Sequence, residues 1–164
     1  MGNVVCGLGA SPGVHDVHVA ALDGDYAEVE RLLLADPSCV HARCEAVADG
    51  LALPEAGVAP GMTVLAIAAR HGRLDMLELL LTHPLAAWAG LELHCADDRG
   101  LTPLMHASAR GEAAAVRRLL RAPDGLEGVA LASQLGCTPL FLAYVMTRAT
   151  RRARSLPRAL PTSP

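Results

Sequence analysis

Apolar and small residues recur along the chain in a fixed order, and this order predicts pairs of short helices. Residues 61–72 and residues 100–111 align position by position, each opening on Gly-x-Thr and closing on Gly. In both copies an apolar segment containing Leu follows the closing glycine and ends at a proline. A third copy begins at residue 136, and a degenerate earlier copy covers residues 13–24. The repeated unit is therefore predicted to be helix, turn, helix and loop.

The residues at the boundaries of the units have the chemistry that helix ends require. Thr102 and Thr138 can cap a helix N-terminus with a side-chain oxygen, and the proline after each of them suits the first helical position, where no N–H is needed. The closing glycines can adopt the left-handed conformation that ends a helix and reverses the chain. These glycines are Gly24, Gly72 and Gly111.

The composition also favours a stack of closely packed helices. Of the 164 residues, 52% are hydrophobic but only 2% are aromatic, so Ala and Leu supply most of the apolar mass. Small residues gather in the first helix of each unit and Leu in the second. Stacked units with small inner helices and bulky outer helices are expected to curve and to leave one concave face.

One unit carries a motif that resembles the ankyrin repeat. The family pattern is Asp-x-x-Gly-x-Thr-Pro-Leu, a small pair, a turn glycine and a Leu pair, and it is matched by Asp97, Gly100, residues 102–104, residues 107–108, Gly111 and residues 119–120. The resemblance implies an all-α, ankyrin-like helix-turn-helix repeat solenoid. It also implies a protein–protein interaction module, acting as an adaptor, scaffold or inhibitor, with no enzymatic activity.

The units of this chain are longer than those of the family. Measured between threonine positions, starting from His15, the spacings are 48, 39 and 36 residues, whereas the family period is about 33. The loops between units are therefore expected to be extended. The histidine that commonly follows the Thr-Pro-Leu run is present only as His18, so we expect a weakened polar network between units. The expected units are 13–60, 61–99, 100–135 and a partial unit 136–146, preceded by a flexible leader 1–12.

The charge of the chain is divided unevenly. Residues 1–147 hold nine Arg against 17 acidic residues, whereas residues 148–164 hold five Arg and no acid. An acidic body with few aromatic residues argues against nucleic-acid binding. We expect residues 147–164 to form a basic, disordered tail or a frayed last helix, because they contain no apolar stripe.

Two features raise the question of membrane association. Gly2 and Cys6 resemble an N-myristoylation and palmitoylation pair, which would anchor the protein peripherally; the alternative is an unmodified leader. Residues 128–147 are uncharged and precede an Arg cluster, as in a membrane span, but the start of the repeat at residue 136 explains them better. The scattered cysteines and the lack of a secretory signal favour a cytoplasmic protein.

Candidate chemistry is sparse. Cys39, His41 and Cys44, with His94 and Cys95, offer metal-ligand types and suggest, as an alternative function, a metal-dependent or redox switch in the first long loop. The spacing lacks a Cys-x-x-Cys pair, so free thiols are the favoured interpretation. No cofactor, metal or small-molecule substrate is expected, and no arrangement of nucleophile and base indicates catalysis.

The expected partner is another protein, bound at the concave face and the loop tips. The candidate contacts are residues outside the expected core of the well-matched units, together with the single Trp. They are Arg70, His71, Trp88, Asp98, Arg99, Met105, His106 and Arg110. Apolar residues in 51–58 and 84–93 are not explained by the stack and are expected to contribute a further partner-facing patch.

Overall fold

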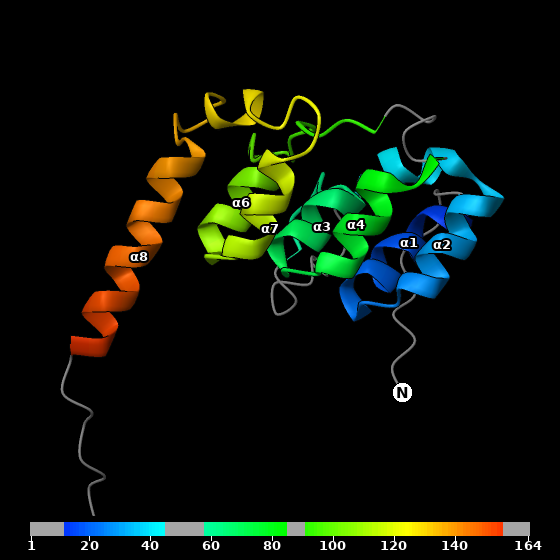
Figure 1. Ribbon diagram of the computed structural model, residues 1–164, viewed down its shortest axis with the longest axis horizontal. Helices are drawn as coiled ribbons and strands as arrows, with labels where there is room; N and C mark the ends of the chain where they lie inside the picture. The colour runs from blue at the N-terminus through cyan, green and yellow to red at the C-terminus, as the bar shows by residue number, and fades with distance from the viewer. Residues whose placement is uncertain (1–11, 45–57, 85–90, 156–164) are drawn as a thin grey trace, which may run out of the picture.

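The computed structural model describes residues 12–44, 58–84 and 91–155. Within these ranges the secondary structure is helical, apart from an isolated antiparallel bridge between Arg43 and Thr63. Three helix pairs follow one another along the chain, separated by loops with short 3-10 turns, and one long helix ends the series (Figure 1). The elements are α1 (Pro12–Asp23), α2 (Tyr26–Ala35), η1 (Pro37–His41), α3 (Val64–Arg70), α4 (Leu74–Thr82), α6 (Pro103–Arg110), α7 (Ala113–Leu120), η2 (Glu127–Val129) and α8 (Pro139–Ser155).

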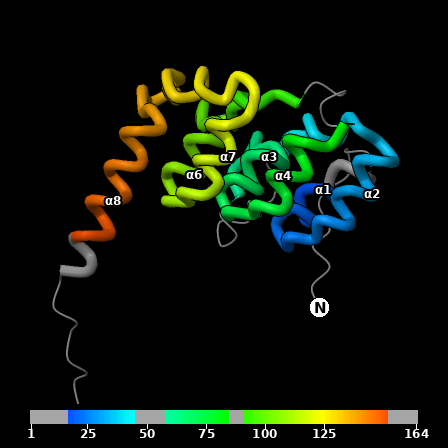
Figure 2. The backbone as a smooth tube through the Cα atoms, viewed as in Figure 1, coloured from blue at the N-terminus to red at the C-terminus, as the bar shows by residue number. Residues whose placement is uncertain are grey.

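The helices form two rows. The first helices of the units pack side by side in the order α1, α3, α6, α8, and the second helices α2, α4 and α7 cover them (Figure 2). The strongest packing joins α3 to α6 and α6 to α8, whereas the outer helices contact one another more sparsely. This arrangement confirms the predicted helix-turn-helix solenoid, in which small residues allow the inner row to pack tightly.

The predicted helix ends are present. The hydroxyl groups of Thr63, Thr102 and Thr138 each accept a hydrogen bond from the backbone N–H three residues later, at 3.3–3.4 Å. The closing glycines Gly24, Gly72 and Gly111 have φ values of +79°, +63° and +77°, the left-handed conformation that lets the chain reverse after a helix.

The core is deepest in the second unit. Every residue from 61 to 69 is buried, and Leu65, Ile67, Met76 and Leu77 of α3 and α4 are among the fully buried large side chains. This unit has described helices on both sides, so both of its faces are removed from water.

The loops between units are joined by backbone hydrogen bonds. The N–H of Asp98 donates to the carbonyl of Pro60 at 3.2 Å, and the N–H of Gln134 donates to the carbonyl of Arg99 at 3.3 Å. Of the histidines, His18 contacts the carbonyl of Ala42 at 3.0 Å. Backbone groups thus link neighbouring loops where the expected histidine side chains are missing.

The last unit differs from the sequence-based prediction. A boundary was expected after residue 146, but α8 continues without a break to Ser155. The helix needs no buried stripe there, because Ala and Arg are strong helix formers. Of the two alternatives expected for the tail, a disordered segment or a last helix, residues 147–155 are helical, and residues 156–164 lie outside the described ranges. Among the described helices, none has the length and apolar character required to cross a bilayer.

Candidate partner-binding face

Arg70 lies within electrostatic reach of two other arginines, Arg99 and Arg110, which come from different elements. Arg70 belongs to the last turn of α3, Arg110 to the last turn of α6, and Arg99 to the loop before α6. Burial lowers the pKa of Arg70, and the positive charges of Arg110 and Arg99 lower it further, while Asp97 opposes them. We call Arg70, Arg99 and Arg110 the arginine cluster.

No member of the arginine cluster forms an ion pair with a carboxylate of the described residues, although the charge of nearby Asp97 acts on Arg70. Within the described ranges, Arg31 pairs with Glu28 and Arg118 with Glu78 at the outer helices, and Asp97 contacts His106. None of these pairs includes a member of the cluster. The Nε atom of the half-buried Arg70 is shielded from water and donates to no described acceptor. A partly desolvated, unpaired guanidinium is costly in isolation, and a carboxylate brought by a partner would offset that cost.

Two of the expected contact residues belong to the core instead. Met105 is 0% exposed and His106 is 2% exposed. The prediction that they are surface positions is wrong, because α8 and α3 both pack on α6 and remove its sides from water. His106 instead contacts Asp97 and so helps to hold the loop before α6 in place.

Asp97 was not selected as a site residue, although it opens the motif. Its Oδ1 accepts hydrogen bonds from the N–H groups of Arg99 and Leu101 at 2.9 and 2.8 Å, and its Oδ2 lies 3.0 Å from His106 Nε2. Burial lowers the pKa of His106, although Asp97 opposes this shift. We therefore assign His106 as a neutral imidazole that donates from Nε2 to Asp97. The pair fixes the loop that presents Arg99.

Arg43 also contributes to this face and was not identified from the sequence. Its Nε donates to the carbonyl of Gly61 at 3.2 Å, and its Nη2 donates to the carbonyl of Ala96. Its guanidinium therefore connects two successive loops. No motif marks this residue, because the two carbonyl groups come together only when the units stack.

The other expected contact residues have different positions. Asp98 is exposed beside Arg99, and His71 is half-buried at the C-cap of α3. Trp88 lies outside the described residues, as do the two proposed acylation positions, Gly2 and Cys6.

The cysteines and histidines of the proposed switch do not gather around a common point in the described residues. No group of three or more His, Cys, Asp or Glu side chains there could hold a metal ion. Cys39 is buried, and burial, with a smaller effect from Asp36, raises its pKa to about 11. Its sulfur is therefore a protonated thiol at neutral pH, whereas metal coordination and disulfide exchange require the thiolate.

A second concavity lies between the ends of α4 and α7. This open cleft has a volume of about 540 Å³ and is lined by leucines of α4 and of the loop 91–95, with Glu92, Asp124 and Glu127 at its polar side. The ring of His94 contacts the carbonyl of Asp124 at 3.1 Å and connects the two sides. The apolar segment 84–93, noted in the sequence, contributes Leu91 and Leu93, while residues 85–90 lie outside the described ranges.

Stacked helix pairs with an exposed row of loops define a helical repeat protein. A family model described as ankyrin repeats, in three copies, matches residues 17–124. The chain therefore belongs to the ankyrin repeat family, a class of protein–protein interaction modules.

The comparison with solved structures supports the same fold. The chain is similar to one in the crystal structure of the yeast ribosomal protein Rps3 in complex with its chaperone Yar1. The TM-score is 0.61 at 18% identity, over 88% of this chain and 95% of that chain. A comparison with curated protein sequences found no significant match.

Proposed function

We propose that this protein is a cytoplasmic adaptor, scaffold or inhibitor that binds an acidic segment of a partner protein at the arginine cluster. The observation that carries the proposal is that Arg99 and Arg110 both act on the half-buried Arg70, and that no ion pair of the described residues includes any of the three. A partner carboxylate would offset the repulsion that Arg110 and Arg99 exert on Arg70 and would form charge-assisted hydrogen bonds with these side chains.

The construction of the face suits binding rather than catalysis. Asp97 and Arg43 hold the loops in place through side-chain hydrogen bonds to the backbone. A preorganised face loses little conformational freedom on binding, which favours affinity. Because most of the remaining charge in residues 1–147 is acidic, the cluster would also orient an acidic partner during the encounter.

Charge reversal tests the proposal. The protein is used as bait in extract from its own host, and the specifically retained protein is identified by mass spectrometry. We expect the variant Arg99→Glu/Arg110→Glu to bind that partner at least about tenfold more weakly, because two interfacial charges are reversed together. Adding Arg70→Glu should weaken binding of the partner further. Binding of the unmodified protein should also fall as salt rises.

A matched control distinguishes the effect of reversing charges within the arginine cluster from the effect of changing the net charge of the protein. The variant Arg117→Glu/Arg121→Glu makes the same charge change at two exposed positions at the end of the α7 segment. It should retain the partner, and all variants should show unchanged helical circular dichroism. Retention of the partner by the cluster variants would place the interface elsewhere and contradict the proposal.

A further inference from the structure

Helix α8 leaves a large apolar surface uncovered. It packs on α6 and η2, where Leu142 and Ala143 are half-buried. By contrast, Leu140, Phe141 and Tyr144 are 75%, 51% and 57% exposed. A protein with only four aromatic residues thus presents two of them to water on one helix. Exposed clusters of large apolar side chains mark interaction sites.

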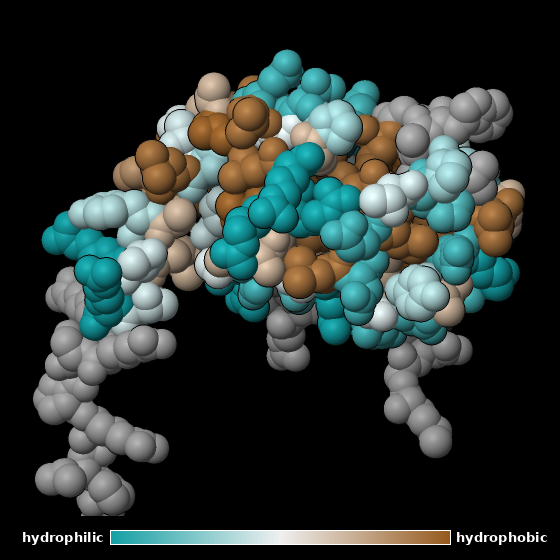
Figure 3. Space-filling model, viewed as in Figure 1, coloured by the Kyte–Doolittle hydropathy of each residue, from teal (hydrophilic) through white to brown (hydrophobic). Residues whose placement is uncertain are grey.

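The spacing of these residues places them on one side of the helix. Residues 140, 141, 144, 145 and 148 follow the i, i+1, i+4, i+5, i+8 pattern of a single helix face, and residue 151 continues it. Figure 3 shows apolar surface where α8 begins, giving way to hydrophilic surface along the helix. We call this face the α8 strip; it consists of Leu140, Phe141, Tyr144, Val145, Arg148 and Arg151.

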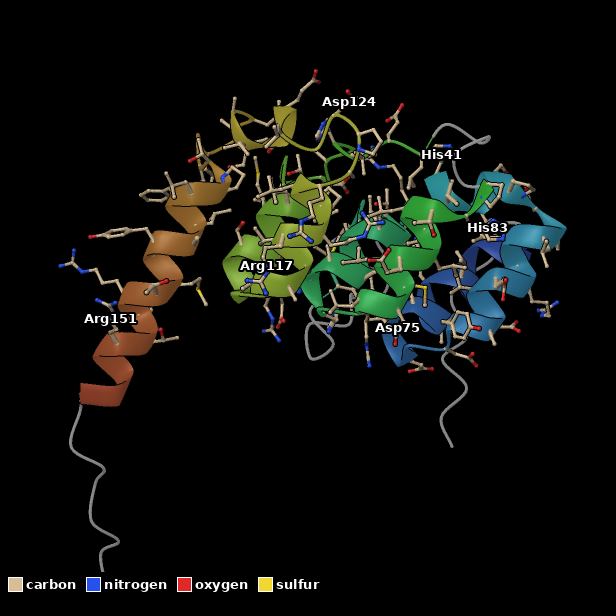
Figure 4. The ribbon with its side chains drawn as sticks, viewed as in Figure 1. His41, Asp75, His83, Arg117, Asp124 and Arg151 are labelled. Carbon is tan, nitrogen blue, oxygen red and sulfur yellow. The ribbon has the colours of Figure 1, made fainter. Side chains whose placement is uncertain are left out.

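The basic half of the α8 strip lacks an acidic neighbour. Residues 128–164 contain no Asp or Glu, and the ion pairs of the described residues do not include Arg148 or Arg151. Arg148 Nη1 donates to the hydroxyl of Tyr144 at 3.1 Å, which joins the apolar and basic halves. Arg151 points away from the stack (Figure 4).

The repeat architecture indicates what kind of element fits beside α8. Each of α1, α3 and α6 packs against the second helix of its own unit, but no second helix follows α8 in the described residues. The 17 residues of α8 span about 26 Å, which is long enough to support a partner helix of several turns. In the other units an inner helix is paired with a second helix, so a helix is the element expected beside α8.

We propose that the α8 strip binds an amphipathic helix of a partner protein, with apolar residues against Leu140, Phe141, Tyr144 and Val145 and carboxylates against Arg148 and Arg151. An antiparallel partner would carry its acidic residues in its N-terminal half, where the helix dipole favours them. This surface is distinct from the arginine cluster and extends the protein's function to a second contact.

A second copy of the chain fits the α8 strip less well through its own α8. Two parallel α8 helices would oppose their arginines, and two antiparallel ones would place arginines against the apolar half of the other copy. Neither arrangement supplies the carboxylates that Arg148 and Arg151 lack. Charge complementarity therefore favours a different, acidic partner.

A helical peptide library tests the proposal with the full chain. The displayed peptides have 16 residues, with Leu fixed at positions of one helix face in one half and all other positions randomised. Selection uses the unmodified protein after removal of peptides that bind the support without protein. We expect selected peptides to be enriched in Asp and Glu in the half without the fixed Leu.

The selected peptide then serves as a probe for individual residues. Phe141→Asp and Arg148→Glu/Arg151→Glu should each weaken its binding at least about tenfold, the loss typical of a central contact. A peptide with its acidic residues replaced by Lys should bind the double variant better than the unmodified protein. Leu34→Asp, at an exposed leucine of α2, and Arg117→Glu/Arg121→Glu are matched controls that should bind normally.

Three results would overturn the proposal. The first is selection of peptides without acidic enrichment, or of peptides that Phe141→Asp binds equally well. The second is binding to vesicles containing phosphatidylserine that is lost in the strip variants while no peptide is selected, which would assign the strip to a membrane surface. The third is a concentration-dependent dimer in sedimentation that Phe141→Asp abolishes, which would assign it to a second copy.

Discussion

At the scale of single residues, Asp97 organises the loop before α6 because its carboxyl group accepts hydrogen bonds from three donors. Two are backbone N–H groups and the third is His106 Nε2. Ser133 occupies the corresponding place before the fourth unit, and its hydroxyl accepts a hydrogen bond from the N–H of Cys137 at 3.2 Å. A carboxyl group can therefore fix both the loop and the following helix, whereas a hydroxyl holds only the loop.

His106 should make stability depend on pH. Its pKa in the folded protein lies below the ordinary value of 6.5 because burial disfavours the imidazolium. Between these two values the unfolded chain binds the extra proton, so the contribution of neutral His106 is complete above pH 6.5 and is lost as the pH falls through the folded pKa. Acidification should therefore weaken the folded state through this residue.

The variant His106→Gln isolates that contribution. It should be less stable than the unmodified protein at pH 7.5 by about 1–3 kcal/mol, because the hydrogen bond to buried Asp97 is disturbed. The difference should shrink between pH 7.5 and 5, as measured by urea unfolding at each pH. A difference that grows on acidification would show that protonation stabilises the pair and that our assignment of neutral His106 is wrong.

At the scale of elements, glycines with positive φ have two different functions. Gly61 and Gly111 have nearly equal φ values of +78° and +77°. A side chain at Gly111 would meet nothing within 4 Å, whereas at Gly61 its first carbon would lie 2.7 Å from the backbone nitrogen of Asp98. Gly111 therefore serves the turn alone, and Gly61 also allows neighbouring loops to approach.

This difference gives a matched pair of substitutions. Gly111→Ala should cost about 1 kcal/mol, the price of a left-handed conformation with a side chain. Gly61→Ala carries the same cost and must also separate the loop from Asp98, so it should lose at least about 1 kcal/mol more. Thermal or urea unfolding measures both variants. Equal losses would show that the close approach of the two loops does not limit stability.

The length of α8 could not be predicted from the pattern of buried residues alone. The pattern predicted that the helical unit ends near residue 146, because no apolar stripe follows. The structure continues the helix to Ser155, since residues 147–155 contain Ala and Arg and no helix breaker. Apolar periodicity indicates which part of a helix is buried, and local propensity decides how far the helix extends beyond the stack.

At the scale of the whole molecule, stability should be graded along the array. The units contact mainly their neighbours, so a central unit gains interfaces on two sides and a terminal one on a single side. The α3 segment is completely buried from Val64 to Ala69, whereas every residue from 144 to 151 is exposed. The centre of the stack should therefore open least often.

Hydrogen exchange measures this gradient. We expect amides of α3 to exchange most slowly and those of residues 147–155 most quickly, close to the rate of the chain in urea, because exposed helical turns beyond the stack fray easily. The arginine-rich end should gain protection when the selected peptide binds the α8 strip. Protection of residues 147–155 equal to that of α3 in the free protein would contradict a graded array.

The order of residues along the chain specifies the repeat architecture of this protein. Local chemistry fixed the helix ends, because Thr102 and Gly111 act through atoms a few residues away. The recurrence of that chemistry specified a stack and hence an ankyrin repeat. The resemblance also placed Arg70, Arg99 and Arg110 among the candidate contacts. The sequence of a single unit, however, does not predict that these arginines lie near one another.

The packing between units determines which side chains are exposed and which charges interact. Met105 and His106 become core residues because α3 and α8 pack on α6, a fact that depends on residues far away in the chain. The same stacking brings the arginine cluster together and leaves the α8 strip uncovered. Burial and electrostatic coupling belong to contacts between units, so the pattern within one unit could not specify them.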